Sequence, residues 1–251
     1  SEWVANVTGE KNAIISEFDR PSGSGMSSET LLFESTWGEA ENEVHKKLVA
    51  RLAPTDQDIP VFPNYNLSSQ VKVMKLVEQL TDIKVPKVLW EEASIDVLGV
   101  PFFVMEQIQG RVPPDIPPYV FGGWLFDATP ESQLQLQELC VGIIAQLHQI
   151  KQKSPDTDFL EFHTKGDTAL KRHFTNQKEY YYWVVQDSRQ HPVIEKAFDW
   201  LESHWPEESE SVLSWGDARI GNIMFDSKTL EPVAVLDWEM AGLAPVEVDL
   251  G

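Results

Sequence analysis

The sequence has little cysteine and no long apolar run. Cys140 is the only cysteine among 251 residues, which excludes an internal disulfide and a metal site built from several thiolates. No apolar stretch reaches the roughly 18 residues that a membrane-spanning helix needs, and the N-terminus lacks the basic and apolar regions of a signal peptide. We therefore expect a cytoplasmic protein without a membrane segment. Cys140 lies in an apolar helical stretch, where a small core residue is expected.

Basic residues are half as numerous as acidic ones. The 20 Lys and Arg residues against 40 Asp and Glu residues give a formal net charge of −20. Such a charge repels phosphate polyanions, so nucleic acids and anionic membranes are not expected partners. It would suit a cationic ligand, although many proteins are acidic for solubility alone. Hydrophobic residues at 42% and charged residues at 24% indicate an ordinary folded protein without disorder.

The chain changes character near residue 110, where a β-rich part gives way to a helical part. Apolar alternation and 3/4 spacing predict the elements, and four prolines in residues 111–118 predict a loop. The expected strands are residues 30–37, 43–52, 87–91, 100–105, 222–225 and 232–236. The expected helices are residues 66–80, 132–150, 175–185 and 193–204. The predicted fold class is α+β, with a small β-rich N-lobe followed by a mostly helical C-lobe.

Three polar residues near the C-terminus have a spacing that suits phosphoryl transfer. Asp217 and Asn222 lie five residues apart in a loop that leads into a strand, and Asp237 follows a second strand. In phosphoryl transfer, one carboxylate orients the attacking hydroxyl while an amide and another carboxylate hold Mg²⁺. Oxygen ligands of this kind suit magnesium. Asp and Asn are also common turn residues beside strands, so the pattern has a structural alternative.

A segment rich in glycine and serine precedes the first long strand. Its residues Ser22, Gly23, Gly25, Ser27 and Ser28 allow backbone N–H groups to approach phosphates closely. The segment is neither a P-loop nor a dinucleotide fingerprint. Taken alone, it also fits an ordinary hairpin loop.

In chain order, these parts resemble the aminoglycoside phosphotransferase family, small-molecule kinases of the protein-kinase-like fold. The resemblance runs from about Ile14 to the last residue and implies a bilobal structure. It implies an N-lobe over residues 1–105, a hinge over residues 106–110 and a C-lobe over residues 111–251. The landmarks that carry it are residues 22–30, 47–54 (KLVARLAP), 67–80, 102–110 (FFVMEQIQG), 215–224 and 236–242.

The resemblance assigns a role to each candidate site residue in the C-terminal segment. Asp217 would be the catalytic base or the residue that positions the hydroxyl, and Asn222 and Asp237 would bind Mg²⁺. Arg219 would neutralise phosphoryl charge, with a plain surface arginine as the alternative. Asp249 would brace the catalytic loop from a buried position.

The resemblance also assigns the nucleotide site. Ser22, Gly23, Gly25, Ser27 and Ser28 would cover the nucleotide, and Arg51 would anchor its phosphates. The carbonyl of Glu106 and the amide of Ile108 in the hinge would bind adenine. The expected cofactors are ATP, with GTP as the alternative nucleotide, and Mg²⁺.

The chain departs from the family pattern at several positions. Arg51 stands where the family often has lysine, although a guanidinium can bind phosphate as a bidentate fork. Gln70 takes the place of the usual glutamate partner on the helix and cannot form an ion pair. Lys47, on the same strand face as Arg51, is the alternative anchor. Trp215 replaces a common histidine of the catalytic loop, and His148 is expected to be structural.

Together with these residues, the resemblance implies an ATP-dependent kinase that phosphorylates a hydroxyl of a small molecule. An aminoglycoside is one expected acceptor, because its ammonium groups suit an acidic C-lobe. A hydroxyacyl compound or another non-antibiotic alcohol is an alternative. A catalytically silent nucleotide-binding module is a third hypothesis, motivated by Arg51 and Gln70. Relatives continue with further helices, so part of the acceptor pocket is expected to lie outside this sequence, and the sequence leaves the oligomeric state open.

Overall fold

The computed structural model describes residues 1–20, 28–39, 42–55, 59–154 and 156–251. The chain divides into two compact units. The first unit comprises residues 1–139 and 220–239, and the second comprises residues 140–219 and 240–251. The division falls inside helix α3 (Pro130–Leu147). The expected lobes, separated by a hinge at residues 106–110, stay a prediction.

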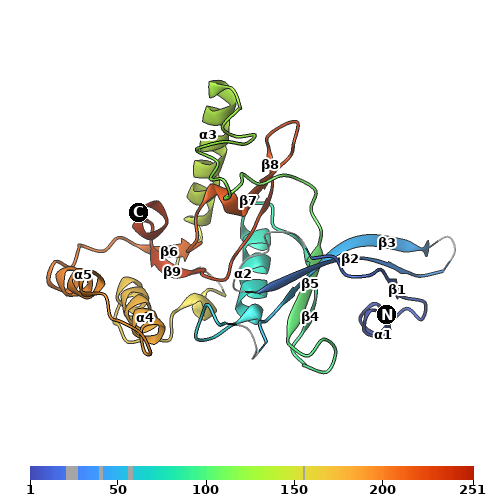
Figure 1. The fold of residues 1–251 in the computed structure, drawn as a ribbon, viewed down its shortest axis with the longest axis horizontal. Helices are drawn as coiled ribbons and strands as arrows, with labels where there is room; N and C mark the ends of the chain where they lie inside the picture. The colour runs from blue at the N-terminus through green and yellow to red at the C-terminus, as the bar shows by residue number, and fades with distance from the viewer. Residues whose placement is uncertain (21–27, 40–41, 56–58, 155) are drawn as a thin grey trace. The chain divides into compact units, whose positions relative to one another are not determined.

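The first unit contains a five-stranded antiparallel sheet (Figure 1). Its strands pair in the order β1-β2-β3-β5-β4. Their bounds are β1 (Ile14–Ile15), β2 (Glu29–Trp37), β3 (Val44–Leu52), β4 (Val88–Glu92) and β5 (Phe102–Glu106). The four strands predicted in this region, at residues 30–37, 43–52, 87–91 and 100–105, are confirmed, with ends that differ by at most two residues.

One face of this sheet is closed by an N-terminal helix that the sequence analysis did not predict. Helix α1 (Glu2–Thr8) brings Trp3 against Phe102, with 4.8 Å between the ring centroids. The Trp3 indole N–H also donates to a carboxylate oxygen of Glu92 over 2.8 Å. Leu48, Ala50 and Leu52 of β3 are buried in the apolar cluster on this face. Since side chains alternate along a strand, Arg51 of β3 lies on the opposite face.

Helix α2 (Leu67–Leu80) begins one residue after the predicted start, because Asn66 is its N-cap. The side chain of Asn66 accepts a hydrogen bond from the amide of Ser69, a standard N-cap. Val71, Met74 and Val77 share the buried face, as their 3/4 spacing requires.

A hairpin of β7 (Ile223–Phe225) and β8 (Pro232–Val235) completes the first unit. The 3₁₀ turn η3 (Ile220–Asn222) leads into it. Arg111 and Phe225 exchange backbone hydrogen bonds of 2.8 Å in both directions. Next to this bridge, a Cβ on Gly110 would lie 2.6 Å from the side chain of Met224, so only glycine allows this close approach. The segment that follows the expected hinge is therefore fastened to the hairpin.

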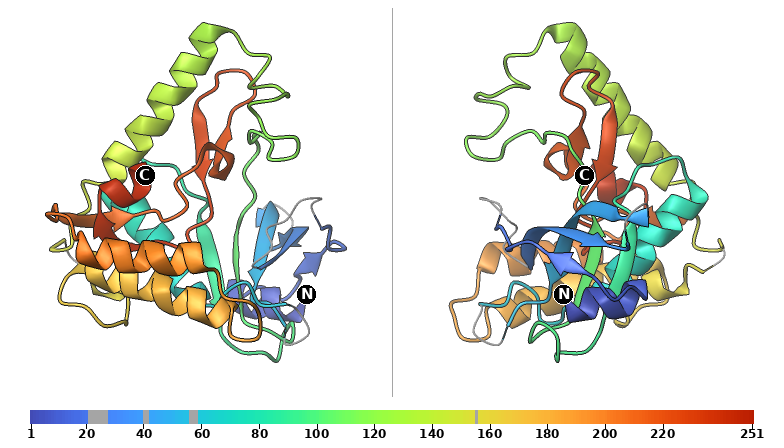
Figure 2. Two further views of the ribbon diagram at one scale, coloured as in Figure 1. Left: turned by 60° about the vertical axis from the view of Figure 1, so that its left-hand side comes forward. Right: turned by 90° about the vertical axis from the view of Figure 1, so that its right-hand side faces the viewer.

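The second unit combines helices with the short pair β6 (Ser211–Ser214) and β9 (Gly242–Pro245). Figure 2 shows α4 (Ala169–Val184) and α5 (Pro192–Ser203) side by side. Phe198 joins them, with 5.5 Å between its ring centroid and that of Phe174. The remaining helices are the 3₁₀ turn η2 (Asp158–Leu160) and α6 (Glu247–Leu250). In the part of the chain that the structure describes, no helix is long and apolar enough to cross a bilayer.

Cys140 lies in α3 and is partly buried, less deeply than a core residue. Burial raises the pKa of its thiol from 9.0 to about 11. The reactive species is the thiolate, and a rise of this size lowers its population at pH 8 by roughly 100-fold. We therefore expect native protein to react with a disulfide reagent such as DTNB about 100-fold more slowly than urea-unfolded protein. Absorbance stopped-flow would measure both rates, and equal rates would contradict the raised pKa of the Cys140 thiol.

Candidate active site

Asn222 and Asp237 flank the β7–β8 hairpin at its open end. Ile223 pairs with Val235 in the register of the two strands. Beyond this pair, the amide of Leu236 donates to the carbonyl of Asn222 over 2.9 Å. Asn222 is buried, and Asp237 has a φ of 63°, a backbone conformation that Asp and Asn tolerate better than most residues. The hairpin thus brings together the two residues predicted to bind Mg²⁺.

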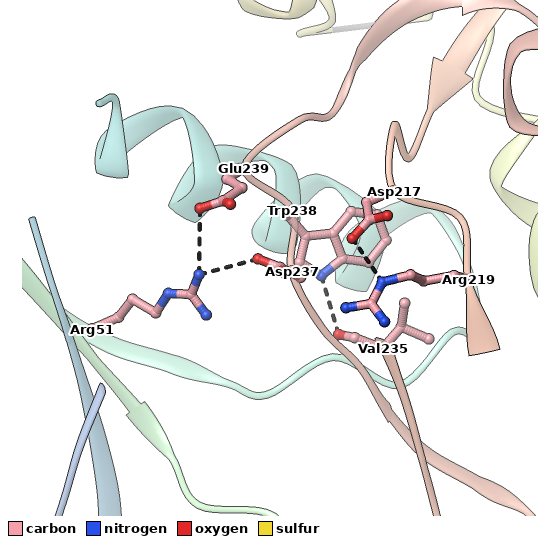
Figure 3. Close-up of polar contacts among 7 residues, drawn as sticks. All are labelled: Arg51, Asp217, Arg219, Val235, Asp237, Trp238 and Glu239. Atoms are coloured by element: carbon pink, nitrogen blue, oxygen red, sulfur yellow. Dashed lines mark hydrogen bonds and ion pairs between the residues drawn. The ribbon is translucent and has the colours of Figure 1, made fainter. Parts of the chain in front are cut away.

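Arg51 makes ion pairs with two carboxylates of the segment that follows this hairpin (Figure 3). Its Nη2 donates to Oδ1 of Asp237 over 3.1 Å and to Oε2 of Glu239 over 3.4 Å. All three side chains are largely buried, with exposed fractions of 15% for Arg51, 24% for Asp237 and 13% for Glu239. Glu239 was missed in the sequence analysis. One positive and two negative charges leave a net charge of −1 in this cluster.

The donor set fits a magnesium ion that also binds phosphate. Asn222 and Asp237 offer amide and carboxylate oxygens, the ligands that Mg²⁺ prefers. Among the described residues, no group of three or more His, Cys, Asp or Glu side chains forms a metal site by itself. A magnesium ion held by Asn222 and Asp237 would therefore take its other ligands from phosphate and water. The excess negative charge of the Arg51 cluster would favour such a cation.

The expected adenine-binding segment begins at the end of β5. Glu106 pairs with Leu48 of β3 and forms an ion pair with Lys46. Its amide donates to the carbonyl of Lys87 over 3.0 Å. The next amide, that of Gln107, donates to the carbonyl of Lys47 over 3.0 Å. The backbone that leads to Ile108 is thus held by two neighbouring strands, and the adenine contacts of Glu106 and Ile108 stay predictions.

The predicted nucleotide-covering loop lies mostly outside the described residues. Ser22, Gly23, Gly25 and Ser27 belong to the segment that the structure does not describe. Ser28 precedes β2 and is buried, and its hydroxyl has no hydrogen-bond partner among the described residues.

Asp217 and Arg219 belong to the second unit, in the loop after β6. Arg219 Nε donates to Oδ2 of Asp217 over 3.1 Å (Figure 3). The amide of Arg219 also donates to the carbonyl of Asp217 over 2.9 Å. Both side chains are partly exposed, at 35% for Asp217 and 45% for Arg219. The guanidinium therefore orients the carboxylate that was predicted to be catalytic, while leaving it open to solvent.

A buried carboxylate holds the backbone of this loop. Asp249 has a side chain only 1% exposed, and it accepts hydrogen bonds from the amides of Trp215 and Gly216, both over 3.0 Å. It also accepts from Oγ of Ser214 over 2.8 Å and lies 3.0 Å from Nε2 of His148. The predicted bracing role of Asp249 and structural role of His148 agree with these contacts.

Gly216 is required by the same turn. Its φ is 84°, and a Cβ there would lie 2.2 Å from the carbonyl oxygen of Met240. Trp215 is buried, as its structural role predicts. The tight turn at Gly216 and the carboxylate of Asp249 together determine the direction of the backbone between β6 and Asp217.

The alternative phosphate anchor, Lys47, has a different environment from Arg51. Its side chain is 55% exposed and lies 3.4 Å from a carboxylate oxygen of Glu34 on β2. Gln70 lies on the buried face of α2. Arg51, which is buried beside Asp237, is therefore the better placed of the two cations for a role next to a metal ligand.

Parts of longer known proteins are similar in sequence to this chain. A 28% identical segment of 188 residues occurs in acyl-CoA dehydrogenase family member 11 of Pongo abelii, covering 74% of this chain and 22% of that protein. A 25% identical segment of 231 residues occurs in the probable acyl-CoA dehydrogenase IBR3 of Arabidopsis thaliana, covering 88% of this chain and 26% of that protein. The chain thus spans about a quarter of the length of these curated relatives.

Solved structures show the same fold at low identity. A thermostable mutant of the aminoglycoside phosphotransferase APH(4)-Ia, in a ternary complex with AMP-PNP and hygromycin B, matches with a TM-score of 0.60 at 15% identity, over 99% of this chain and 74% of that chain. A macrolide 2′-phosphotransferase from Brachybacterium faecium matches with a TM-score of 0.57 at 14% identity, over 98% of this chain and 73% of that chain. The predicted α+β, protein-kinase-like fold is confirmed.

The family itself is shown by the sequence match. The model of the phosphotransferase enzyme family, which also carries the short name APH, matches residues 25–251. This match includes residues 106–110, 215–224 and 236–242, which the sequence analysis predicted to be the hinge, the catalytic loop and the metal-binding segment. The chain belongs to the phosphotransferase enzyme family.

Proposed function

We propose that this protein transfers the γ-phosphate of ATP to a hydroxyl group of a small molecule. The observation that carries the proposal is the ion pair between Arg51 and Asp237, at 3.1 Å. It places a buried guanidinium, suited to phosphate, beside a carboxylate suited to magnesium. Membership of the phosphotransferase enzyme family supports the same reaction class.

The nucleotide would bind to residues of the first unit. Arg51 holds the phosphates through charge-assisted hydrogen bonds. The Glu106 carbonyl and the Ile108 amide bind adenine, and the segment that ends at Ser28 covers the phosphates. Asn222 and Asp237 hold Mg²⁺, which supplies positive charge to the phosphate oxygens when it is bound. GTP is the alternative nucleotide.

The transfer itself would need Asp217 and Arg219. The acceptor oxygen forms a bond to the γ-phosphorus, and the bond from that phosphorus to the bridging oxygen of ADP breaks. Asp217 orients the acceptor hydroxyl and takes its proton. Arg219, whose side chain already donates a hydrogen bond to Asp217, offsets the negative charge on the oxygens of the transferred phosphoryl group. The products are a phosphate monoester, ADP and a proton.

A hydroxyacyl compound or another non-antibiotic alcohol is the acceptor class that the relatives favour. The matching segments belong to proteins named as acyl-CoA dehydrogenase family members. The second candidate is an aminoglycoside, because its ammonium groups would be attracted by a chain with a net charge of −20.

An acceptor screen tests the proposal. ADP formation from Mg·ATP would be followed with panels of hydroxyacyl compounds, simple alcohols and aminoglycosides, and the phosphate monoester would be identified by mass spectrometry. ADP formation that depends on one panel would support transfer and name the acceptor class. ATP binding without turnover on any acceptor would favour a catalytically silent nucleotide-binding module and contradict the proposed reaction.

The magnesium assignment gives a separate prediction. We expect Mg²⁺ to tighten ATP binding by on the order of tenfold or more, a typical size for coupling between two ligands. Asp237→Ala should remove most of this coupling, because it deletes one of only two protein ligands. Titration calorimetry with and without Mg²⁺ would measure the coupling. ATP binding in the presence of a chelator serves as the control, and full coupling in the variant would contradict the assignment.

A further inference from the structure

Arg51 needs a negatively charged partner, because its side chain is only 15% exposed. A buried charge without a partner is strongly destabilising. In the family pattern described in the sequence analysis, the partner of the basic residue on the strand is a glutamate on the N-lobe helix. Here the corresponding residue of α2 is Gln70, which carries no charge. The two carboxylates that contact Arg51 both come from the segment after β8 instead.

These two carboxylates are not equivalent. Asp237 is the predicted magnesium ligand, so a bound cation would draw its negative charge away from Arg51. Glu239 lies two residues further along and is the less exposed of the two, at 13% against 24%. Glu239 therefore stays available to Arg51 when the metal binds to Asp237.

Trp238 fixes the segment that carries both carboxylates. Its side chain is buried, and its indole N–H donates to the carbonyl of Val235 over 3.1 Å. The side chains of Asp237 and Glu239 reach the same nitrogen of Arg51, Nη2, from two directions (Figure 3). Because they share one donor, loss of the Glu239 contact would leave that nitrogen to Asp237 alone. Arg51 would then compete with magnesium for the carboxylate of Asp237.

We propose that Glu239 is a positioning residue that holds Arg51 for binding the nucleotide phosphates, in place of a carboxylate on the helix. The proposal rests on the proposed function, because it requires Arg51 to bind phosphate. It gives Glu239 no contact with the nucleotide and no place in the coordination shell of the metal. Glu239 acts through the orientation of Arg51.

A double-mutant cycle tests this role. Titration calorimetry would give the affinities for Mg·ATP and for adenosine in the wild type, Arg51→Ala, Glu239→Gln and the double variant. Arg51→Ala should weaken ATP binding by roughly tenfold to a hundredfold, the range for a lost charge-assisted hydrogen bond. Glu239→Gln should weaken it by about tenfold, and the double variant should be no weaker than Arg51→Ala. Adenosine, which lacks phosphates, should bind equally well to all four proteins.

Three results for nucleotide affinity, and a fourth for magnesium coupling, would overturn the proposal while leaving the proposed function standing. The first three concern affinity. They are unchanged ATP affinity in Glu239→Gln, additive losses in the double variant, and equal losses for ATP and adenosine. Loss of Mg²⁺ coupling by Glu239→Gln in the Arg51→Ala background would show a metal ligand, which also overturns it. Glu231→Gln removes an exposed charge from the same hairpin and is the matched control. Absence of ATP binding in the wild type would instead contradict the proposed function.

Discussion

Replacing Asp217 by asparagine should lower turnover by roughly 10²–10⁴-fold, the usual range for loss of a general base. Asparagine keeps the size of the side chain, and its amide oxygen can still accept the bond from Arg219 Nε that the structure shows at 3.1 Å. The variant would lose the negative charge that, in the proposed reaction, orients the hydroxyl and takes its proton. In a loose transition state the proton moves late, so the lower end of the range applies if orientation is the main contribution.

The affinity for Mg·ATP should be nearly unchanged in Asp217→Asn, because the proposed role of this carboxylate is to contact the acceptor and not the nucleotide. Single-turnover and steady-state kinetics on the acceptor found by the screen would measure the loss, and calorimetry would measure nucleotide binding. Asp187→Asn, the same change at an exposed position of the second unit, is the matched control. Near-normal turnover in a folded Asp217→Asn variant would show that another group positions the hydroxyl.

The elements that could be predicted from the sequence are those with long periodic patterns. Helix α2 begins one residue after its predicted start, because Asn66 is counted as the cap. Strands β2 and β3 are nine residues long, so each has a longer pattern of apolar residues than the other strands of the sheet. Helix α1 was missed because seven residues show less than two full turns of an apolar stripe. Strands β6 and β9 were missed because almost all of their residues are buried, so that they show no alternation of apolar and polar residues.

Helix α4 shows how a local cap extends an element beyond its apolar pattern. The pattern predicted a start at residue 175, whereas the helix begins at Ala169. The hydroxyl of Thr168 accepts a hydrogen bond from the amide of Lys171 over 3.1 Å and fixes the earlier start. Such a cap is visible in the sequence only as a threonine, a residue that is common in loops as well.

In the candidate site too, residues that are close in the sequence could be predicted, whereas contacts between distant residues could not. Asp217, Asn222 and Asp237 could be proposed as site residues from the sequence, because they are close to one another in the chain. Glu239 was missed because its partner Arg51 lies 188 positions away. A carboxylate two residues after Asp237, with a tryptophan between them, was the available signal. Trp238 is buried, so the backbone between the two carboxylates is held in place.

The second large effect is expected on stability, at Asp249, whose buried carboxylate accepts hydrogen bonds from the residues that precede Asp217. Removal of its carboxylate leaves the amides of Trp215 and Gly216 and the hydroxyl of Ser214 without their acceptor. Each unsatisfied buried donor costs roughly 1–3 kcal/mol. Relaxation and entry of water reduce the sum, so Asp249→Ala should lower the free energy of unfolding by about 3–5 kcal/mol, as for a broken buried ion pair.

Urea unfolding followed by tryptophan fluorescence would measure the change at Asp249. Asp187→Ala, at an exposed position of the same unit, should shift the free energy of unfolding by less than about 0.5 kcal/mol. His148→Gln removes one of the four contacts and should cost about 1–2 kcal/mol. Combined with Asp249→Ala, it should add almost nothing, because its partner is already gone. Full additivity would mean that His148 stabilises the protein independently of Asp249. An Asp249→Ala variant as stable as the wild type would mean that the loop keeps its conformation without this carboxylate and that the tight turn at Gly216 is sufficient.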